Sequence, residues 1–254
     1  MLSRDKYFLA LADKAQRDDG RKADQLRDIT IQTNVVEKAE GSAVVNLGNT
    51  KVMVGVKLDV KEPFPDTPEE GILIAGAEFS PIASPLFESG PPSEESIELA
   101  RIVDRGIRES HAINVEKLCV TKGEEVWSVN LDIYILNNAG NMIDAAALAS
   151  IAALLTTKLP KYEDKKVIRG ELKEKLPMAC KPIAVTHLNI GNNLFADPNF
   201  EEERIQDSRL TVTTIDNGNI SSLQKGGPKG LTLKQIEDMF EASVKVGKEI
   251  RKKL

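Results

Sequence analysis

Three arginines on one predicted helix are the residues of this sequence with the clearest chemical potential. Arg101, Arg105 and Arg108 are spaced i, i+4 and i+7, which places them on one face of a helix. A guanidinium group binds phosphate well, so this face could hold a phosphate backbone in a salt-sensitive, sequence-independent way. The alternative is a solvated face on which Glu98 pairs with Arg101 and Glu109 with Arg105, which would contribute little to stability. These residues alone favour the solvated face.

Standard catalytic motifs are missing from the sequence. It contains no GxSxG elbow, no HExxH and no Walker loop, and the glycines of 226–230 lack phosphate-loop spacing. His111 and His187 neighbour no candidate nucleophile, so we interpret both as packing or surface residues. Cys119 and Cys180 lie far apart without a CxxC pair, which favours core packing over zinc binding. We therefore expect neither a metal nor a cofactor.

The composition excludes several classes of protein. The chain has 254 residues, 41% of them apolar, and its 34 Lys and Arg face 39 Asp and Glu for a net charge of -5. Such a balance argues against a free-standing DNA or RNA binder, although it leaves room for a local basic strip. The first 20 residues are too charged for a signal peptide, and no stretch approaches the roughly 20 apolar residues of a membrane span. We expect a cytoplasmic protein with no membrane partner.

Periodicity predicts an α+β chain. In the first part, helices are expected at 7–15, 94–110 and 142–156, and strands at 29–35, 43–47, 51–60, 71–80, 115–121 and 125–136. The helix at 142–156 is apolar on all sides and must be buried. Residues 159–177 are charged and are predicted to be irregular. Strands at 182–190, 193–196, 210–216 and 220–225 and a helix at 232–252 follow. The order suggests two similar β-β-β-α lobes, 1–165 with an added N-terminal helix and 166–254, packed as one compact unit.

Several stretches, taken in order, resemble the RNase PH family of 3′ exoribonucleases. They are DGRKADQLR at 19–27, GSA at 41–43, GNTK at 48–51, IELAR at 97–101 and AG at 139–140. No single stretch is diagnostic, but the ordered set is specific and extends from about residue 18 to the end of the chain. The resemblance implies the RNase PH-like fold of two similar lobes. It also implies phosphorolysis, in which inorganic phosphate attacks the terminal phosphodiester of RNA, as the reaction of active members.

Two parts of the family's active site are altered here. Active members carry Gly-Ser-Arg at the start of the buried helix, where N–H groups, a hydroxyl and a guanidinium hold phosphate. This chain has Asn141 and Met142 in place of the last two residues, so the resemblance implies a degenerate phosphate site. Active members also grip RNA with two arginines just before Ile-Glu-Leu, where this chain has Glu94 and Glu95. Like charges repel a phosphodiester, and we assign no catalytic residue.

Two aspartates remain at positions that matter in the family. Asp207 stands where the resemblance places the catalytic aspartate, but without bound phosphate it has no nucleophile to assist. A hydrogen-bonding role just before a strand is the favoured interpretation of Asp207. Asp144 follows Gly140 in the first helical turn, where a negative charge favours the helix dipole. The segment from Gly140 to Ala145 is similar to that of the non-catalytic exosome subunits.

The resemblance therefore points to the non-catalytic RNase PH-like subunits of the archaeal exosome ring. It implies a hexameric ring that alternates with a catalytic RNase PH-like subunit, RNA-binding cap proteins and single-stranded RNA, with no DNA. In that setting Arg101 and Arg105 are expected to contact RNA in the shared cleft, while the role of Arg108 is left undecided. Two alternatives remain: a competent phosphorolytic exoribonuclease with an altered phosphate site, and a structural subunit that never touches RNA.

Overall fold

The first half of the chain folds around a six-stranded sheet. The structure is a computed structural model that describes residues 3–254. In sheet order the strands are β1 (Ile29–Thr33), β2 (Gly41–Leu47), β3 (Thr50–Lys61), β6 (Glu125–Asn137) and β4 (Ile72–Phe79), with β5 (Cys119–Thr121) paired to β6. All pairs are antiparallel except β4 with β6. Alternate residues of β3, such as Val54 and Val56, are fully buried, as period-two hydrophobicity predicts.

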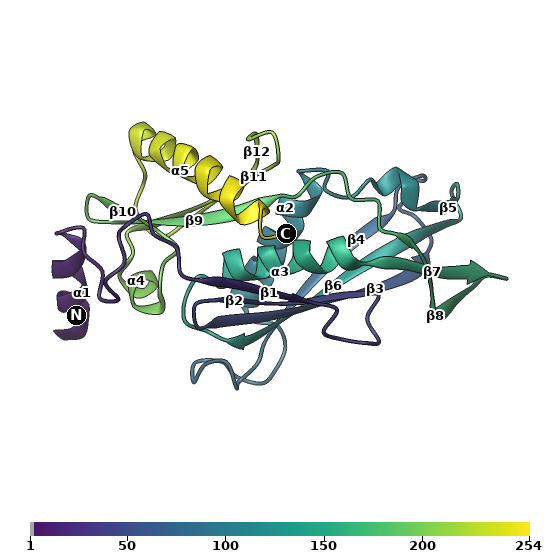
Figure 1. Ribbon diagram of the computed structural model, residues 1–254, viewed down its shortest axis with the longest axis horizontal. Coiled ribbons are helices and arrows are strands. Elements are labelled where there is room, and N and C mark those ends of the chain that lie inside the picture. The colour runs from purple at the N-terminus through teal and green to yellow at the C-terminus, as the bar shows by residue number, and fades with distance from the viewer. Residues whose placement is uncertain (1–2) are drawn as a thin grey trace.

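The second half builds an antiparallel four-stranded sheet. Its order is β10 (Asn193–Ala196), β9 (Ile183–Ile190), β11 (Ser208–Thr214) and β12 (Ile220–Gly226). A short helix, α4 (Phe200–Ile205), joins β10 to β11 and starts with a capping box between Asn199 and Glu202. The long helix α5 (Leu233–Arg251) contacts β9 and β11 and covers one face of this sheet (Figure 1).

Two helices lie between the sheets and join the lobes. α3 (Met142–Thr156) contacts β2 and β3 on one side and β9 on the other, and Figure 1 shows it between the two layers. α2 (Glu94–Arg108) packs on α3, β4 and β12, and its N-cap Ser93 accepts a hydrogen bond from the Ser96 amide. Apolar residues of both lobes, including Ile151 of α3 and Val185 of β9, form one core. The predicted α+β class and buried helix are confirmed.

The N-terminal helix docks on the second lobe, although sequence order groups it with the first. α1 (Ser3–Ala12) packs against α4, where Arg4 pairs with Glu201 at 2.7 Å and Asp5 with Arg204 at 3.3 Å. Ala12 belongs to an apolar cluster with residues of β9 and β10. The helix ends earlier than predicted, because Ala15 already has a left-handed φ of 53°.

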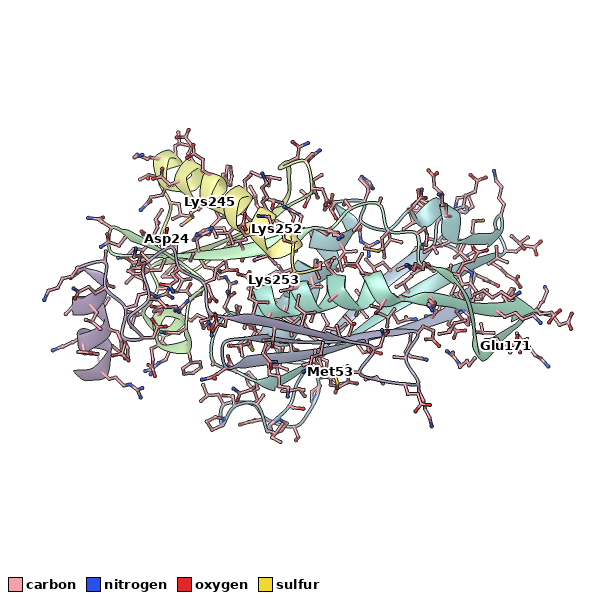
Figure 2. The ribbon with its side chains drawn as sticks, viewed as in Figure 1. Asp24, Met53, Glu171, Lys245, Lys252 and Lys253 are labelled. Carbon is pink, nitrogen blue, oxygen red and sulfur yellow. The ribbon has the colours of Figure 1, made fainter. Side chains whose placement is uncertain are left out.

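The prediction that 159–177 is irregular is wrong. The segment forms an antiparallel ribbon of β7 (Lys158–Glu163) and β8 (Lys166–Lys175), which projects from one end of the molecule and carries Glu171 on its exposed surface (Figures 1 and 2). Most of β8 is exposed, so its sequence lacks the alternation of apolar and polar residues by which a half-buried strand is predicted. The predicted lobe boundary at 165 and 166 falls at the ribbon's turn and stays a prediction.

Two further elements differ from the sequence prediction. Residues Val115–Leu118, expected to begin a strand, form a 3-10 turn capped by the Asn114 side chain, and only Cys119–Thr121 pair as a strand. Cys119 and Cys180 are both partly exposed, although Cys180 packs against the core as predicted. Over residues 3–254, no helix is long and apolar enough to cross a membrane.

Candidate functional site

Two of the three predicted arginines share one groove. Arg101 and Arg105 are exposed on α2, and Arg105 Nη1 donates a hydrogen bond of 3.3 Å to Gln224 Oε1 on β12. The groove has a volume of about 420 Å³, and its lining comes from α2 and β12: Glu94, Ile97, Glu98, Arg101, Ile102, Arg105 and Gln224. Because α2 packs on β12, residues of both lobes contribute to this groove.

Glu98 and Asp104, which lie near these arginines on α2, are paired with other arginines, whereas Glu94 of the groove lining has no ion pair among the described residues. The predicted pairs Glu98–Arg101 and Glu109–Arg105 are wrong: within residues 3–254, neither Arg101 nor Arg105 forms an ion pair. Glu98 Oε1 instead lies 2.6 Å from Arg209 Nη2 on β11. The guanidinium groups that face the groove are therefore open to an external anion.

The third arginine has a different environment. Arg108 pairs with Asp104 at 2.7 Å, and its Nη2 also donates to the Leu73 carbonyl of β4 at 3.1 Å. The hydrogen bond to Asp104 raises the pKa of Arg108 above its usual value. Because this side chain is already bound to Asp104 and β4, the groove is left to Arg101 and Arg105.

The start of α3 is filled by the chain's own carboxyl groups. Asn141, its N-cap, is buried with a left-handed φ of 53°, and its backbone N–H donates to Glu203 Oε1 of α4 at 2.8 Å. The Asn141 side-chain amide donates to Asp144 and Asp197, both at 2.8 Å. Met142 packs against the core. A phosphate that approached the Asn141 N–H would have to displace Glu203.

Glycine is required immediately before this cap. Gly140 has a φ of +89°, and an added Cβ would lie 2.4 Å from the Asn199 carbonyl carbon and the Phe200 nitrogen. The close approach brings the loop before α4 against the first turn of α3. It thereby places Glu203 within hydrogen-bonding distance of Asn141.

Burial and charge give these carboxyl groups different pKa values. Burial raises the pKa of Asp144 to about 7, against the hydrogen bonds from Asn141 and Thr186 that lower it. Burial likewise raises the pKa of Glu203 to about 7, because the Asn141 N–H and the more distant arginines compensate only in part. Burial also acts to raise the pKa of Asp197, but the hydrogen bonds and charge of Arg27 outweigh it and lower that pKa.

Arg27 forms hydrogen bonds and an ion pair with several groups of this cluster. Arg27 Nη2 lies 2.6 Å from Asp197 Oδ1, and the same guanidinium donates to the carbonyls of Ala139 and Gly140. Arg21 also reaches Asp197, at 3.0 Å. Arg21 and Arg27 belong to the stretch that carries the family resemblance, but sequence analysis assigned them no role. That stretch is the signal through which they could have been found.

Asp207 stands just before β11, as predicted. Its Oδ2 accepts a hydrogen bond of 2.9 Å from the Gly191 amide, and its Oδ1 lies 2.8 Å from Lys229 Nζ. This arrangement is the hydrogen-bonding role that the sequence favoured, whereas the catalytic role stays untested. His187 is buried against the Ser243 hydroxyl at 2.8 Å, and burial lowers its pKa to about 4.

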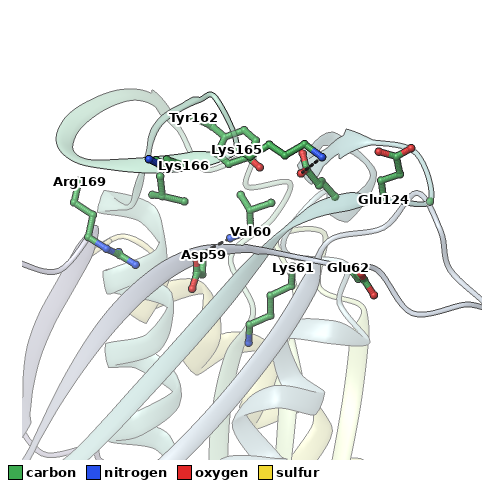
Figure 3. A pocket seen from close by; sticks show the side chains of 12 residues that line it. Asp59, Val60, Lys61, Glu62, Glu124, Tyr162, Lys165, Lys166 and Arg169 are labelled. Carbon is green, nitrogen blue, oxygen red and sulfur yellow. Dashed lines mark hydrogen bonds and ion pairs between the residues drawn. The ribbon is translucent and has the colours of Figure 1, made fainter.

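A second surface cavity lies away from all of the predicted site residues. It has a volume of about 770 Å³ and opens between the end of β3, the start of β6 and the β7–β8 ribbon (Figure 3). Two of its cations lie near carboxylates: Lys165 is 3.8 Å from Glu125, and Arg169 is 3.1 Å from Glu40. Within the described residues, no group of three His, Cys, Asp or Glu side chains could hold a metal ion.

Comparison with known proteins gives a consistent result along the chain. Residues 25–160 match the 3′ exoribonuclease family, domain 1, and residues 180–246 match domain 2. The exosome complex component Rrp42 of Methanosarcina mazei is 47% identical over 247 residues, which cover 96% of this chain and 91% of that protein. This likeness covers both lobes rather than one domain.

Two solved structures resemble the whole fold. One is the Archaeoglobus fulgidus exosome with RNA bound to the active site, with a TM-score of 0.93, 45% identity and coverage of 98% of this chain and 97% of that one. The other is an archaeal exosome core, with a TM-score of 0.88, 42% identity and coverage of 98% and 95%. At this identity the likeness extends beyond the fold to the sequence.

Proposed function

The chain belongs to the RNase PH family of 3′ exoribonucleases, and we propose that it is a ring subunit of an archaeal exosome that has no catalytic activity of its own. In this role it structures the active site of a neighbouring catalytic RNase PH-like subunit and helps hold single-stranded RNA in their shared cleft. The similar solved structures are an exosome with RNA bound to its active site and an archaeal exosome core. RNA-binding cap proteins and a cytoplasmic location belong to the same proposal.

The observation that supports a non-catalytic role is the occupied start of α3. Phosphorolysis needs an anion site for the attacking phosphate, and helix N-termini supply such sites through free N–H groups. Here the Asn141 backbone N–H donates to Glu203, and the Asn141 side-chain amide donates to Asp144 and Asp197. Two more anions, Glu94 and Glu95, begin α2. Inorganic phosphate would find the Asn141 N–H already bound by a carboxyl group and the nearby Arg27 guanidinium already paired with Asp197.

The groove on α2 supports the RNA-positioning role. Arg101 and Arg105 present two guanidinium groups without acidic partners among the described residues, which suits sequence-independent contact with a phosphate backbone. An acidic chain that contributes a few arginines to a shared cleft also accounts for RNA binding at a net charge of -5.

The test of the non-catalytic role is phosphate-dependent shortening of a 5′-labelled RNA. The chain alone should leave the RNA intact, whereas adding it to the catalytic subunit should give more shortening than that subunit shows by itself. Shortening by the chain alone would instead establish a competent enzyme with an altered phosphate site. No gain on adding the chain would contradict its role in structuring the active site.

The RNA-positioning role is tested by charge reversal in the assembled ring. The double variant Arg101→Glu, Arg105→Glu should weaken RNA binding by about tenfold or more and reduce the slope of log affinity against log salt by roughly 1.4, the value for two single-strand phosphate contacts. Lys245→Glu on α5 is the matched control, because Lys245 is an exposed cation away from the groove (Figure 2). Unchanged affinity in the double variant would favour a purely structural subunit.

A further inference from the structure

Both acidic residues within one helical turn of Arg101 are held by other arginines. Glu98 precedes Arg101 by three residues and Asp104 follows it by three, the spacing at which helical side chains of opposite charge pair. Glu98 instead binds Arg209 at 2.6 Å, and Asp104 binds Arg108 at 2.7 Å. Arg101 therefore has no acidic partner among the described residues, as is also the case for Arg105.

Arg209 occupies a site built for its guanidinium. It comes from β11, its side chain is 16% exposed, and its partner Glu98 is 43% exposed. In register with Arg209 on β12 stands Gly226, where an added Cβ would lie 2.9 Å from Arg209 Nη2. Glycine at this position leaves the space that the guanidinium fills, so Arg209 can reach Glu98 from β11.

We propose that Arg209 is a positioning residue of the RNA groove, which holds Glu98 away from Arg101 so that Arg101 can bind an RNA phosphate. The inference rests on the proposed contact of Arg101 and Arg105 with RNA. Arg209 need not touch RNA itself. Its effect is electrostatic: a Glu98 carboxylate released from Arg209 lies within reach of Arg101 and competes with the phosphate for the same guanidinium.

The competition gives a specific pattern across a set of four proteins. RNA affinity of the assembled ring is measured for the wild type, Arg209→Gln, Glu98→Gln and the double variant. Arg209→Gln should weaken binding by about three- to tenfold and lower the salt slope by roughly 0.7, as if one single-strand phosphate contact were lost. Glu98→Gln should bind at least as well as the wild type, because no carboxylate remains to compete.

The double variant decides between positioning and direct contact. With Glu98 neutral, loss of Arg209 should no longer matter, so affinity and salt slope should return to within about twofold of Glu98→Gln. A double variant as weak as Arg209→Gln would overturn the proposal, since Arg209 would then act by touching RNA or by holding the fold. Wild-type affinity in Arg209→Gln would overturn it equally.

Controls separate this inference from the function on which it rests. Arg204→Gln removes an arginine from an exposed ion-pair cluster on α4 and should leave RNA affinity unchanged. Arg209→Met, which keeps an unbranched apolar stem, replaces Arg209→Gln if that variant does not fold. If reversal of Arg101 and Arg105 weakens binding but Arg209→Gln does not, only the positioning role fails. If neither does, the RNA-binding role fails with it.

Discussion

The exposed face of α2 and the buried start of α3 use carboxyl groups in opposite ways. At α3, Glu203, Asp144 and Asp197 converge on Asn141 and fill the place where an external anion could bind. At α2, Glu98 and Asp104 are drawn away from Arg101 by other arginines, which leaves cationic groups open. We propose that the first site is closed to phosphate and that the second is open to it.

The difference shows that a local motif does not determine how a site behaves. Asn141 as an N-cap could donate its N–H to solvent or to a ligand, but a glutamate 62 residues further along the chain takes it. Glu98 could pair within its own helix, but an arginine 111 residues away binds it. In both regions, a residue of the second lobe determines which groups of the first lobe are available to a ligand.

The largest effect is expected from removing the carboxylate that anchors the closed site. Asp197 is fully buried and accepts hydrogen bonds from Arg27, Arg21 and Asn141. In Asp197→Ala the nearly buried Arg27 guanidinium loses its partner, so urea unfolding should show a loss of about 3–5 kcal/mol. Asp197→Asn, which keeps the shape, should lose less. Wild-type stability in Asp197→Ala would mean that the cluster contributes little to holding the lobes together.

The next effect is on the pH dependence of stability, because the closed site holds two carboxyl groups whose pKa is raised to about 7. A carboxyl whose pKa is higher in the folded than in the unfolded state stabilises the fold while it is protonated. That stabilisation is complete below the unfolded value near 4 and is lost as the pH rises through about 7. The wild type should therefore lose stability as the pH rises from about 4.5 to about 7, and the loss should level off above that value.

Glu203→Gln isolates one of these two groups. Glutamine can still accept the Asn141 N–H bond but cannot ionise, so the variant should gain stability relative to the wild type as the pH rises. The difference between the two proteins cancels His187, whose lowered pKa of about 4 acts in the opposite direction between pH 4 and 6.5. The measurement is the urea midpoint of both proteins from pH 5 to 8.5. A constant difference across this range would contradict a raised pKa for Glu203.

Elements with strong local patterns were predictable from the sequence. The α3 helix begins and ends where predicted, because a continuous apolar run after a glycine-asparagine pair leaves little choice. The ribbon at 158–175 and the short helix α4 were missed, because the ribbon is exposed and α4 is only 6 residues long. Neither carries an apolar face long enough to give a periodic signal.

In the candidate site, features that depend on spacing within one helix were predictable, whereas contacts between the lobes were not. Spacing placed Arg101 and Arg105 on one face, and the structure brings both to one groove, while their contact with RNA stays a prediction. Sequence could not predict that Glu203 would fill the start of α3 or that Arg209 would bind Glu98, because these pairs depend on how the two lobes pack. Helical spacing favoured Arg101 as the partner of Glu98 instead of Arg209, because a spacing rule compares only residues of the same helix.

The smallest expected effect concerns the hydrogen bond that orients Arg105 in the open site. Gln224 Oε1 accepts a 3.3 Å bond from Arg105 Nη1, and Gln224→Leu removes that acceptor without adding charge. Because one exposed hydrogen bond contributes little, RNA affinity of the ring should fall by only about twofold, with the salt slope unchanged. Gln224→Glu should weaken binding more and lower the slope by about 0.7, because its carboxylate would compete for Arg105 as a released Glu98 would for Arg101. If the glutamate variant were no weaker than the leucine variant, competition by carboxylates would not govern the groove, and the contrast between the open and closed sites would lose its electrostatic basis.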